Sequence, residues 1–236
     1  MLLAIDTSCY TTSWALVAQD GQVVATAQKL LEVPEGGRGL AQSAALFQHV
    51  KAGHSLFQRL WQQASPTQVK AVAASIQPRP QPDSYMPVFL AGQHWGELLA
   101  CAWQVPFYTT SHQEGHIMAG VKTSGMPEKP NFLAVHLSGG TSEILLVQTT
   151  ATGFAITKVG GTKDLAAGQL VDRVGVALHC AFPAGKALDD LALSYQGDKP
   201  LIKSCTQGSC FSFSGPETAA QRLVQAGAPA GAVAQS

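Results

Sequence analysis

The stretch FLAVHLSGGTSEILLV, residues 132–147, decides the fold of this 236-residue chain, because an earlier stretch repeats its pattern. Laid without gaps on LLAIDTSCYTTSWALV, residues 2–17, it keeps six identical residues of sixteen. Each copy has a short apolar run, a turn of small polar residues and a second apolar run of strand-forming residues, which predicts a β-hairpin. Two such hairpins predict two similar lobes with a cleft between their turns. Buried hairpins of similar composition can also match by chance, and the repeat alone leaves this alternative open.

The composition is that of a globular protein with well-filled cores, since 46% of the residues are hydrophobic and 13% are charged. At this length the chain can form one large domain or two modest ones. Fifteen basic residues balance fifteen acidic ones, so no net charge attracts nucleic acid or an anionic membrane. Such binding would need a local patch or a partner subunit.

Signals for membranes and secretion are lacking in the sequence. No apolar run reaches membrane-spanning length, and the first residues predict a strand where a signal peptide would have a basic start and a cleavage site. We therefore expect no membrane association and a cytoplasmic location. An odd number of scattered cysteines fits reduced thiols better than a disulfide framework. They are Cys9, Cys101, Cys180, Cys205 and Cys210.

Between the two hairpins, apolar periodicity predicts three strands and two helices. They lie near residues 22–29, 69–76 and 105–108 for the strands and near 40–62 and 88–104 for the helices. On the second helix Gly92, Gly96 and Ala100 share one face, so we expect that face to pack closely on a neighbour.

The helix predicted at residues 40–62 carries an apolar stripe at helical spacing, which predicts one buried face. The stripe consists of Leu46, Phe47, Val50, Phe57, Leu60 and Trp61. His54 falls on the same stripe. We expect it to be a core or boundary histidine and not a metal ligand, because no second ligand follows four residues later.

A short polar linker with glycine and two prolines, KTSGMPEKP, precedes the second hairpin and predicts a domain boundary. The first lobe would then span residues 1–121 and the second 131–236. In the second lobe, the sequence predicts a strand near 155–159 and a helix near 164–180 that starts at Asp164. It also predicts further helices after Pro183 and near Pro216. Because the sequence predicts only three clear strands in the second lobe, we expect this lobe to be incomplete, with its remaining elements beyond Ser236.

His112 and His116, in SHQEGH, lie four residues apart at the start of a predicted helix, so both rings project from one face and could hold a metal ion. The metalloprotease pattern needs glutamate directly after the first histidine, whereas Glu114 comes two residues later. With Ser111, Glu114 instead fits a capping box. Because a catalytic metal normally has three protein ligands, the spacing alone favours a metal site and a coincidental surface pair equally.

Ser138, Gly139, Gly140 and Thr141 would place backbone N–H groups and two hydroxyls at a hairpin turn, which suits phosphate oxygens. A tight turn uses the same residues for backbone reasons alone, so SGGT is a weak signal by itself. In the first hairpin Asp6, with Ser8 nearby, could hold a phosphate-bound cation. The alternative for Asp6 is a turn-capping aspartate.

Several segments together resemble the tRNA threonylcarbamoyladenosine transferase family, called TsaD in bacteria and long described as O-sialoglycoprotein endopeptidase. They occur in the family's order and spacing across nearly the whole chain. These segments are IDTSC at 5–9, HQEGH at 112–116, SGG at 138–140, DLAAGQLVD at 164–172, PAG at 183–185 and FSFSG at 211–215.

The resemblance implies an α/β fold of two duplicated actin-like, sugar-kinase-like ATPase lobes of the ribonuclease H-like class. In the family the histidines that match His112 and His116 bind iron or zinc together with a later aspartate, which has no counterpart in this sequence. A later asparagine of the nucleotide site is missing as well. The implied site for ATP or threonylcarbamoyl-adenylate, with Mg²⁺ as a possible companion, consists of Leu137, Ser138, Gly139, Gly140, Asp172 and Gly185.

The reaction implied by the resemblance is acyl transfer: the amine of adenosine 37 in tRNA attacks the carbamoyl carbon of threonylcarbamoyl-adenylate and AMP leaves. The implied partners are tRNA and TsaB-like and TsaE-like subunits, which would supply the basic surface that this neutral chain lacks. The pattern assigns no catalytic residue.

The chain also departs from the family pattern. Tyr10 and Thr11 replace an acidic pair, residues 78–84 replace a glycine-proline-glycine loop, Thr141 replaces a histidine and Glu217 replaces a lysine. Each change touches the predicted cleft. A second hypothesis is therefore a non-catalytic TsaD-like or TsaB-like paralogue that acts as a dimerising scaffold, with a homodimer as its form. A metal-dependent glycoprotease ranks last, because the histidine pair lacks an adjacent glutamate base and a third ligand.

Overall fold

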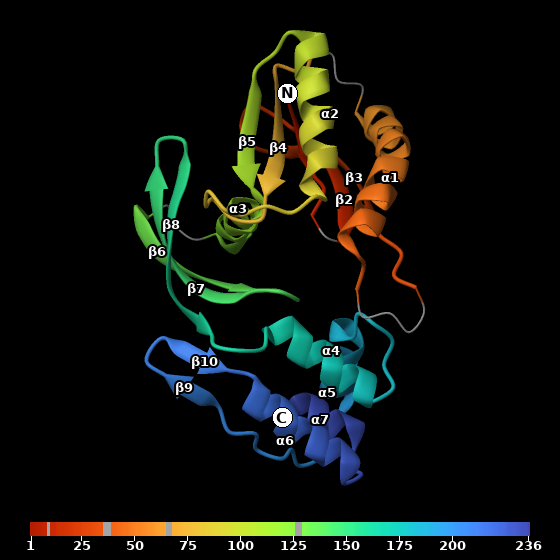
Figure 1. The fold of residues 1–236 in the computed structure, drawn as a ribbon, viewed down its shortest axis with the longest axis vertical. Helices are drawn as coiled ribbons and strands as arrows, with labels where there is room; N and C mark the ends of the chain where they lie inside the picture. Colours follow the sequence, from red (N-terminus) through yellow and green to blue (C-terminus); the bar gives the residue numbers. More distant parts are fainter. Residues whose placement is uncertain (9, 35–38, 65–67, 126–128) are drawn as a thin grey trace. The chain divides into compact units, whose positions relative to one another are not determined.

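The computed structural model describes residues 1–8, 10–34, 39–64, 68–125 and 129–236, and Cys9 of the IDTSC motif lies outside this described part. The chain forms two compact α/β units, Met1–Met126 and Pro127–Ser236, and each has a five-stranded sheet (Figure 1). No helix in the described part of the chain is both long enough and apolar enough to cross a membrane.

The sheet of the first unit has the strand order β3-β2-β1-β4-β5. Its strands are β1 (Leu2–Asp6), β2 (Thr11–Val17), β3 (Val23–Leu30), β4 (Ala71–Gln77) and β5 (Phe107–Ser111). The first three form an antiparallel meander, whereas β4 runs parallel to β1 and β5 runs parallel to β4. This is the strand order of a ribonuclease H-like, actin-like lobe, which confirms the predicted fold class.

Three helices accompany this sheet, α1 (Gln42–Gln63), α2 (Phe89–Trp103) and α3 (His112–Ser124). Parallel neighbours need crossover connections, and α1 and α2 supply them before β4 and before β5. Both helices contribute to the core over Leu3 and Leu16, which are each 0% exposed. A Cβ on Gly96 would lie 2.5 Å from the ring of Phe107, which confirms the close packing predicted for the small face of α2.

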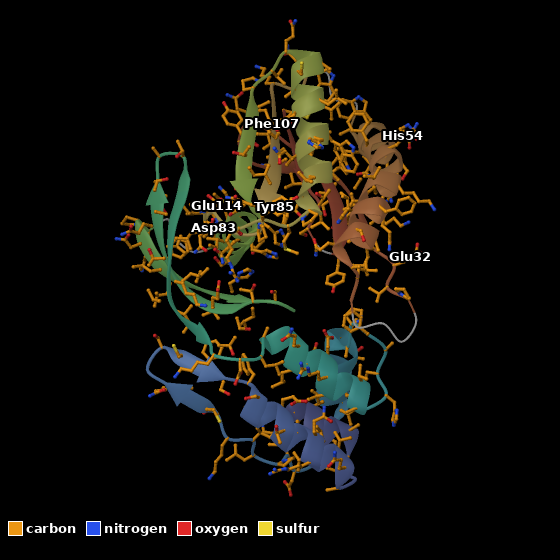
Figure 2. All side chains as sticks on the ribbon, viewed as in Figure 1. Glu32, His54, Asp83, Tyr85, Phe107 and Glu114 are labelled. Atoms are coloured by element: carbon orange, nitrogen blue, oxygen red, sulfur yellow. The ribbon has the colours of Figure 1, made fainter. Side chains whose placement is uncertain are left out.

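The predicted buried face of α1 is confirmed in its second half, where Leu60 is 0% exposed and Phe57 and Trp61 pack against the core, and is wrong in its first half. Phe47 and Val50 are 67% and 57% exposed, and His54 is exposed on the outer side of the helix (Figure 2). Where α1 meets α2 the inward residues are small, because a Cβ on Gly53 would lie only 2.4 Å from the Trp95 ring. The buried residues are Ala45, His49, Ala52, Gly53, Leu56 and Leu60. Hydrophobicity alone favours the bulkier stripe, but close contact with an aromatic neighbour requires small side chains.

The sheet of the second unit has the order β6-β7-β8-β10-β9. Its strands are β6 (Asn131–Leu137), β7 (Ser142–Thr150), β8 (Gly153–Thr162), β9 (Cys205–Gln207) and β10 (Cys210–Ser212). Its helices are α4 (Ala167–Ala177), α5 (Gly185–Ser194), α6 (Ser214–Gln225) and α7 (Ala230–Gln235). The sequence did not predict β9 and β10, since three-residue strands carry almost no periodicity.

Both repeated stretches form antiparallel hairpins, as predicted. Their registers are also the same, because Leu3 pairs with Leu16 in the first hairpin and Leu133 pairs with Leu146 in the second. These are two of the identical pairs in the sequence repeat. The repeat therefore reflects a duplicated structural unit and not a chance similarity of composition.

The segment predicted to be a polar linker is helical at its start, because α3 continues to Ser124 and ends at Gly125 with φ of 62°. A glycine in the left-handed region is a common helix stop. Residues 126–128 of the same segment lie outside the described part of the chain.

Asp164 lies before α4 and not inside it, contrary to the helix predicted to start there. Its carboxylate accepts hydrogen bonds from the hydroxyls of Ser212 and Ser214, both at 2.6 Å, and from the backbone N–H groups of Leu165 and Phe213 at 2.6 and 3.0 Å. These donors, Ser212 foremost, hold the pKa of Asp164 well below its ordinary value. Asp164 thus joins the loop before α4 to the FSFSG segment.

Replacing Asp164 with alanine should loosen this junction, because the hydroxyl and amide donors around its carboxylate lose their acceptor. We expect faster amide hydrogen exchange at Leu165 and Phe213 and a lower unfolding midpoint at pH 7. Since the pKa is lowered on folding, the stabilisation is complete above the ordinary value of about 3.9 and declines as the pH falls below it. The midpoints of wild type and variant should therefore converge in acid. Asp198→Ala, at another exposed carboxylate, is the control, and an equal effect of both substitutions would contradict the role of Asp164.

Candidate functional site

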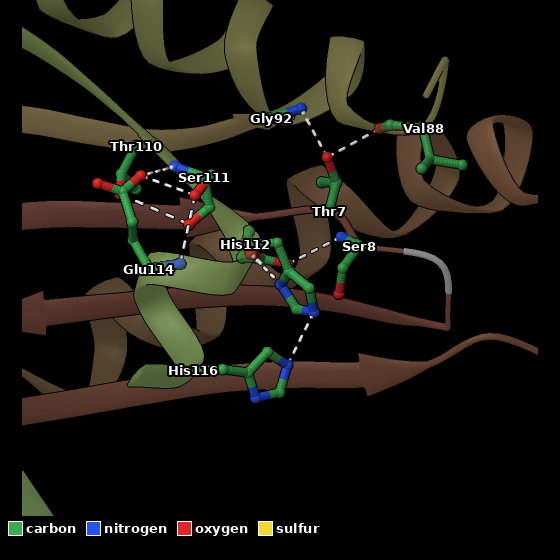
Figure 3. Close-up of polar contacts among 10 residues, drawn as sticks. Thr7, Ser8, Val88, Gly92, Thr110, Ser111, His112, Glu114 and His116 are labelled. Atoms are coloured by element: carbon green, nitrogen blue, oxygen red, sulfur yellow. Dashed lines mark hydrogen bonds and ion pairs between the residues drawn. The ribbon is translucent and has the colours of Figure 1, made fainter. Parts of the chain in front are cut away.

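The start of α3 is fixed by the capping box that the sequence predicts. The Glu114 amide donates to Ser111 Oγ at 3.2 Å, while the Glu114 carboxylate accepts from the Ser111 amide and hydroxyl at 2.8 and 2.7 Å (Figure 3). Thr110 also donates to this carboxylate at 3.3 Å. The capping box sets the first turn of the helix, and with it the direction of the two histidines.

The side chains of His112 and His116 point toward each other, with their Nε2 atoms 2.8 Å apart (Figure 3). Their rings are nearly perpendicular, at 85°. A contact this short requires a proton on one of the two nitrogens in the metal-free protein. Replacing that proton with a cation would leave two imidazole lone pairs directed at one point, which is how a histidine pair holds a metal ion.

Asp6 orients the ring of His112 by contacting Nδ1, the ring nitrogen that does not face His116. Its Oδ2 lies 2.9 Å from His112 Nδ1, and its Oδ1 accepts from the Ser8 amide at 2.8 Å. A carboxylate at Nδ1 stabilises the tautomer in which that nitrogen carries the proton, which leaves Nε2 free to bind a metal. The structure thus joins Asp6 to the histidine pair, a link that the sequence did not predict. The predicted role of Asp6 and Ser8 at a phosphate-bound cation stays a prediction.

The electrostatics of this cluster suit a cation. Burial alone would raise the pKa of Asp6, but the hydrogen bond and charge of His112, with hydrogen bonds from Ser75 and Ser8, lower it to about 2. Burial, followed by the charge of His112, lowers the pKa of His116. At neutral pH the cluster therefore offers an ionised carboxylate behind one ring and a neutral second ring.

Two side chains leave a metal incompletely coordinated. Within the described ranges, no group of three or more histidine, cysteine, aspartate or glutamate side chains could surround one ion. His116 is exposed and the side chain of His112 is 31% exposed, so an ion has access to both nitrogens. The residues present fit two ligands of an iron or zinc site, and its other positions would belong to water, substrate or a further ligand.

The SGG turn of the second unit packs against the start of α4. The Ser138 hydroxyl accepts from the amides of Gly140 and Thr141 at 3.3 and 2.9 Å, and the Ser138 carbonyl accepts from the Gly168 amide at 3.1 Å. A Cβ on Gly168 would lie 2.7 Å from Gly139 Cα, so only glycine permits this approach. The sequence analysis missed Gly168, although the small residues of DLAAG are a signal for close packing.

Most donors at this turn already have acceptors. The Ala166 amide donates to Gln169 at 3.2 Å and the Ala167 amide to Ser142 at 2.8 Å. Among the described residues, this leaves the Gly139 amide and the Ser138 O–H as donors of the SGG turn for which the structure shows no acceptor. The turn therefore offers a phosphate fewer donors than its sequence suggests.

The other predicted nucleotide residues lie on three elements, Asp172 on α4, Gly185 on α5 and Leu137 on β6. Asp172, on α4, accepts from the Ala184 amide at 2.9 Å and so ties α4 to the start of α5. Gly185 begins α5, and a Cβ there would lie 3.9 Å from Val171. Gly185 and Leu137 also line a cavity of about 730 Å³ in this unit. The six predicted residues thus lie on α4 or on segments beside it, and their role at a nucleotide stays a prediction.

A family model described as tRNA N6-adenosine threonylcarbamoyltransferase, TsaD, matches residues 24–235. Among solved structures, the chain is similar to YeaZ from Pseudomonas aeruginosa, with 16% identity, a TM-score of 0.45, and coverage of 66% of this chain and 63% of that chain.

Two further solved structures are similar at low identity. EutJ, an ethanolamine utilization protein from Carboxydothermus hydrogenoformans, has 12% identity, a TM-score of 0.47, and coverage of 80% of this chain and 60% of that chain. The activator of 2-hydroxyisocaproyl-CoA dehydratase from Clostridium difficile, with bound ADPNP, has 11% identity, a TM-score of 0.44, and coverage of 99% and 68%. The chain therefore spans less than two thirds of the length of YeaZ and of EutJ.

Asp6→Asn should weaken metal binding. The amide can donate to His112 Nδ1, which favours the tautomer with its proton on Nε2 and removes one ligand lone pair. We expect the affinity for Zn²⁺, measured by competition with a chromogenic chelator, to fall roughly 10- to 100-fold. The control is Asp20→Asn, because Asp20 accepts only a local turn bond from Gln22 at 3.0 Å. Equal Zn²⁺ affinities for wild type and Asp6→Asn would refute the orienting role.

Proposed function

Because the chain belongs to the TsaD family, we propose that it binds a metal ion and a nucleotide in the cytoplasm and transfers a threonylcarbamoyl group to adenosine 37 of tRNA. The observation that carries this proposal is the convergence of the Nε2 atoms of His112 and His116, with Asp6 behind His112. A carboxylate at Nδ1 commonly orients histidines that bind metal ions. A coincidental pair of surface histidines would not require such a carboxylate.

His112 and His116 would hold iron or zinc through their Nε2 atoms. When bound, either ion supplies a Lewis acid that orients and polarises the carbamoyl group. Asp6 keeps the proton of His112 on Nδ1 and compensates part of the added positive charge. The low pKa of Asp6, about 2, means that it performs this role across the physiological pH range.

The nucleotide, ATP or threonylcarbamoyl-adenylate, would lie at the SGG turn, with Mg²⁺ accompanying a triphosphate. The Gly139 amide and the Ser138 hydroxyl are the donors available to a phosphate oxygen, and Leu137 and Gly185 provide apolar and backbone surface beside them. Asp172 holds α4 and α5 together, so its support of the site is indirect.

The proposed reaction exchanges one bond to the carbamoyl carbon for another. The exocyclic nitrogen of the adenine forms a bond to that carbon, the bond from the carbon to the phosphate oxygen of the adenylate breaks, and AMP leaves. The amine loses a proton in the process, and no residue of the chain is assigned as its acceptor. The chain itself contributes position and charge, through the oriented histidines and the glycine turn.

Partner subunits are part of the proposal. The chain has no net charge, and tRNA binding depends on basic surface. TsaB-like and TsaE-like subunits would supply that surface.

A non-catalytic, dimerising paralogue is the second candidate, and the departures from the family pattern favour it. Glu217, in place of a lysine, lies in the first turn of α6, where it accepts from Gln221 at 3.2 Å. A carboxylate at that position interacts favourably with the positive end of the helix dipole, so Glu217 has a structural role. A metallopeptidase is disfavoured, because the capping box engages the Glu114 carboxylate and leaves the histidine pair without this base.

The transferase proposal predicts rescue of a strain that lacks its authentic TsaD. Expression of this protein, with the partner subunits of its own source, should restore threonylcarbamoyladenosine in tRNA, measured by mass spectrometry of nucleosides. His112→Ala with His116→Ala should abolish the rescue, since both proposed ligands are lost. Stable expression without any modified nucleoside would remove the transferase proposal and leave the scaffold.

The nucleotide proposal predicts that Gly168→Ala weakens ATP binding, because its methyl group must displace the backbone of the SGG turn. Overpacking of this kind costs about 1–3 kcal/mol. If binding requires the turn to return to its original position at this cost, the affinity should fall roughly 5- to 150-fold, measured by isothermal titration. Gly120→Ala is the matched control, because a Cβ there meets nothing within 4 Å. Unchanged ATP affinity in a folded Gly168→Ala variant would exclude the SGG turn as the site.

A further inference from the structure

Asp6 lies between two serines in the sheet of the first unit. On one side it pairs with Ser13 of the antiparallel strand β2. On the other side β1 runs parallel to β4, with Ile5 beside Ala74. One position further along both strands, Asp6 and Ser75 are neighbours. Because neighbouring positions of adjacent strands present their side chains on one face of a sheet, each serine is placed to reach the Asp6 carboxylate.

The two serines differ in what they contact. Ser75 is 6% exposed, and its hydroxyl donates a hydrogen bond to the Asp6 carboxylate. Ser13 is half-buried, and within the described part of the chain no side-chain hydrogen bond joins it to this carboxylate. The contacts that hold the carboxylate thus come from three segments: the Ser8 amide in the turn, Ser75 on β4 and His112 on α3.

Ser75 has a second hydroxyl neighbour, on the side of β5. Thr110 pairs with Ser75 in the sheet, but the Thr110 hydroxyl donates to Glu114 at 3.3 Å. A hydroxyl has one proton to donate. The proton of Thr110 is therefore used at the capping box, whereas that of Ser75 serves Asp6, and each of the two carboxylates has its own hydroxyl donor.

The contact with Ser75 ties the Asp6 carboxylate to the centre of the sheet. The Ser8 amide is only two residues away, so its bond moves with the turn and would be present in a turn-capping aspartate as well. Strand β4 instead lies between β1 and β5, and its continuation also holds α3, since the Pro78 carbonyl accepts from the Gln113 amide at 3.0 Å. The β4 segment therefore fixes the carboxylate relative to the helix that begins with His112.

We propose that Ser75 is a positioning residue of the histidine pair. Its hydroxyl holds the Asp6 carboxylate at Nδ1 of His112, and so keeps this ring in the tautomer that leaves Nε2 free for a metal ion. Ser75 lies outside the segments that resemble the family, so no local pattern marks it. This inference rests on the proposed function for the role of the metal, whereas the tautomer of His112 exists in the metal-free protein and can be measured there.

Ser75→Ala removes the donor and should release the carboxylate. In the metal-free protein, nitrogen NMR shifts of the His112 ring should then show a smaller fraction of the tautomer with its proton on Nδ1. The affinity for Zn²⁺, measured by competition with a chromogenic chelator, should fall roughly two- to tenfold, the usual contribution of one hydrogen bond. Ser75→Thr keeps the hydroxyl and should retain both the tautomer and the affinity. Ser75→Cys, of similar volume but with a weak donor, takes the place of the alanine variant if that one does not fold.

Two comparisons separate this role from general packing. Ser13→Ala is the matched control, because it removes the serine that adjoins Asp6 from the other side, and it should leave the tautomer unchanged. In an Asp6→Ala background, Ser75→Ala should have no further effect on the tautomer or the affinity, since the acceptor is gone. An unchanged tautomer in folded Ser75→Ala, an equal effect of Ser13→Ala, or an effect that persists without Asp6 would each overturn the proposal.

The same measurements distinguish this inference from the proposed function. If the wild type bound no Zn²⁺, the proposed metal site would be overturned, while the tautomer in the Ser75 variants would still decide the role of Ser75. Zn²⁺ binding by the wild type, together with an unchanged tautomer in Ser75→Ala, would overturn the role of Ser75 alone.

Discussion

The turn between β1 and β2 is tied to helices around it, and the histidine pair depends on that attachment. Asp6 contacts His112 at the start of α3. Thr7 donates to the Val88 carbonyl at 2.9 Å and accepts from the Gly92 amide at 3.1 Å, which fixes the turn to the start of α2. Because β1, β4 and β5 run in the same direction, their carboxyl ends lie at one edge of the sheet. The topology therefore brings together Asp6 and His112, which are 106 positions apart.

A third attachment joins β2, where the turn ends, to α1. Thr12 Oγ1 lies 2.8 Å from His49 Nδ1, and both side chains are 0% exposed. Burial lowers the pKa of His49, so its ring is neutral at physiological pH. Within the described structure His49 Nε2 has no partner, and an unsatisfied buried group costs about 1–3 kcal/mol. We infer that this pair helps to set the rotation of α1, with His49 inward and Phe47 outward.

The sequence predicts what depends on local pattern. The hairpins follow from alternation and turn residues, the capping box from the spacing of Ser111 and Glu114, and the histidine pair from its i, i+4 spacing. Prediction from the sequence fails where a feature depends on a contact with a residue that is distant in the chain. The inward face of α1 depends on Trp95, the tautomer of His112 on Asp6, and the acceptor role of Asp164 on serines 48 and 50 residues later. No local periodicity contains these contacts.

The departures at Tyr10 and Thr11 alter charge more than geometry. They lie in the first turn, whose position is set by Asp6, Thr7 and Thr12, all of which keep their partners. Thr11 also begins β2 in regular pairing with Leu30. The loss of two acidic side chains therefore leaves the attachment of the turn intact, while Asp6 remains as an ionised carboxylate beside the histidines. At the proposed metal site, a cation would therefore meet less negative charge than beside the acidic pair of the family pattern. The affinity for a cation is thus the property of this proposed site on which the two departures should act most.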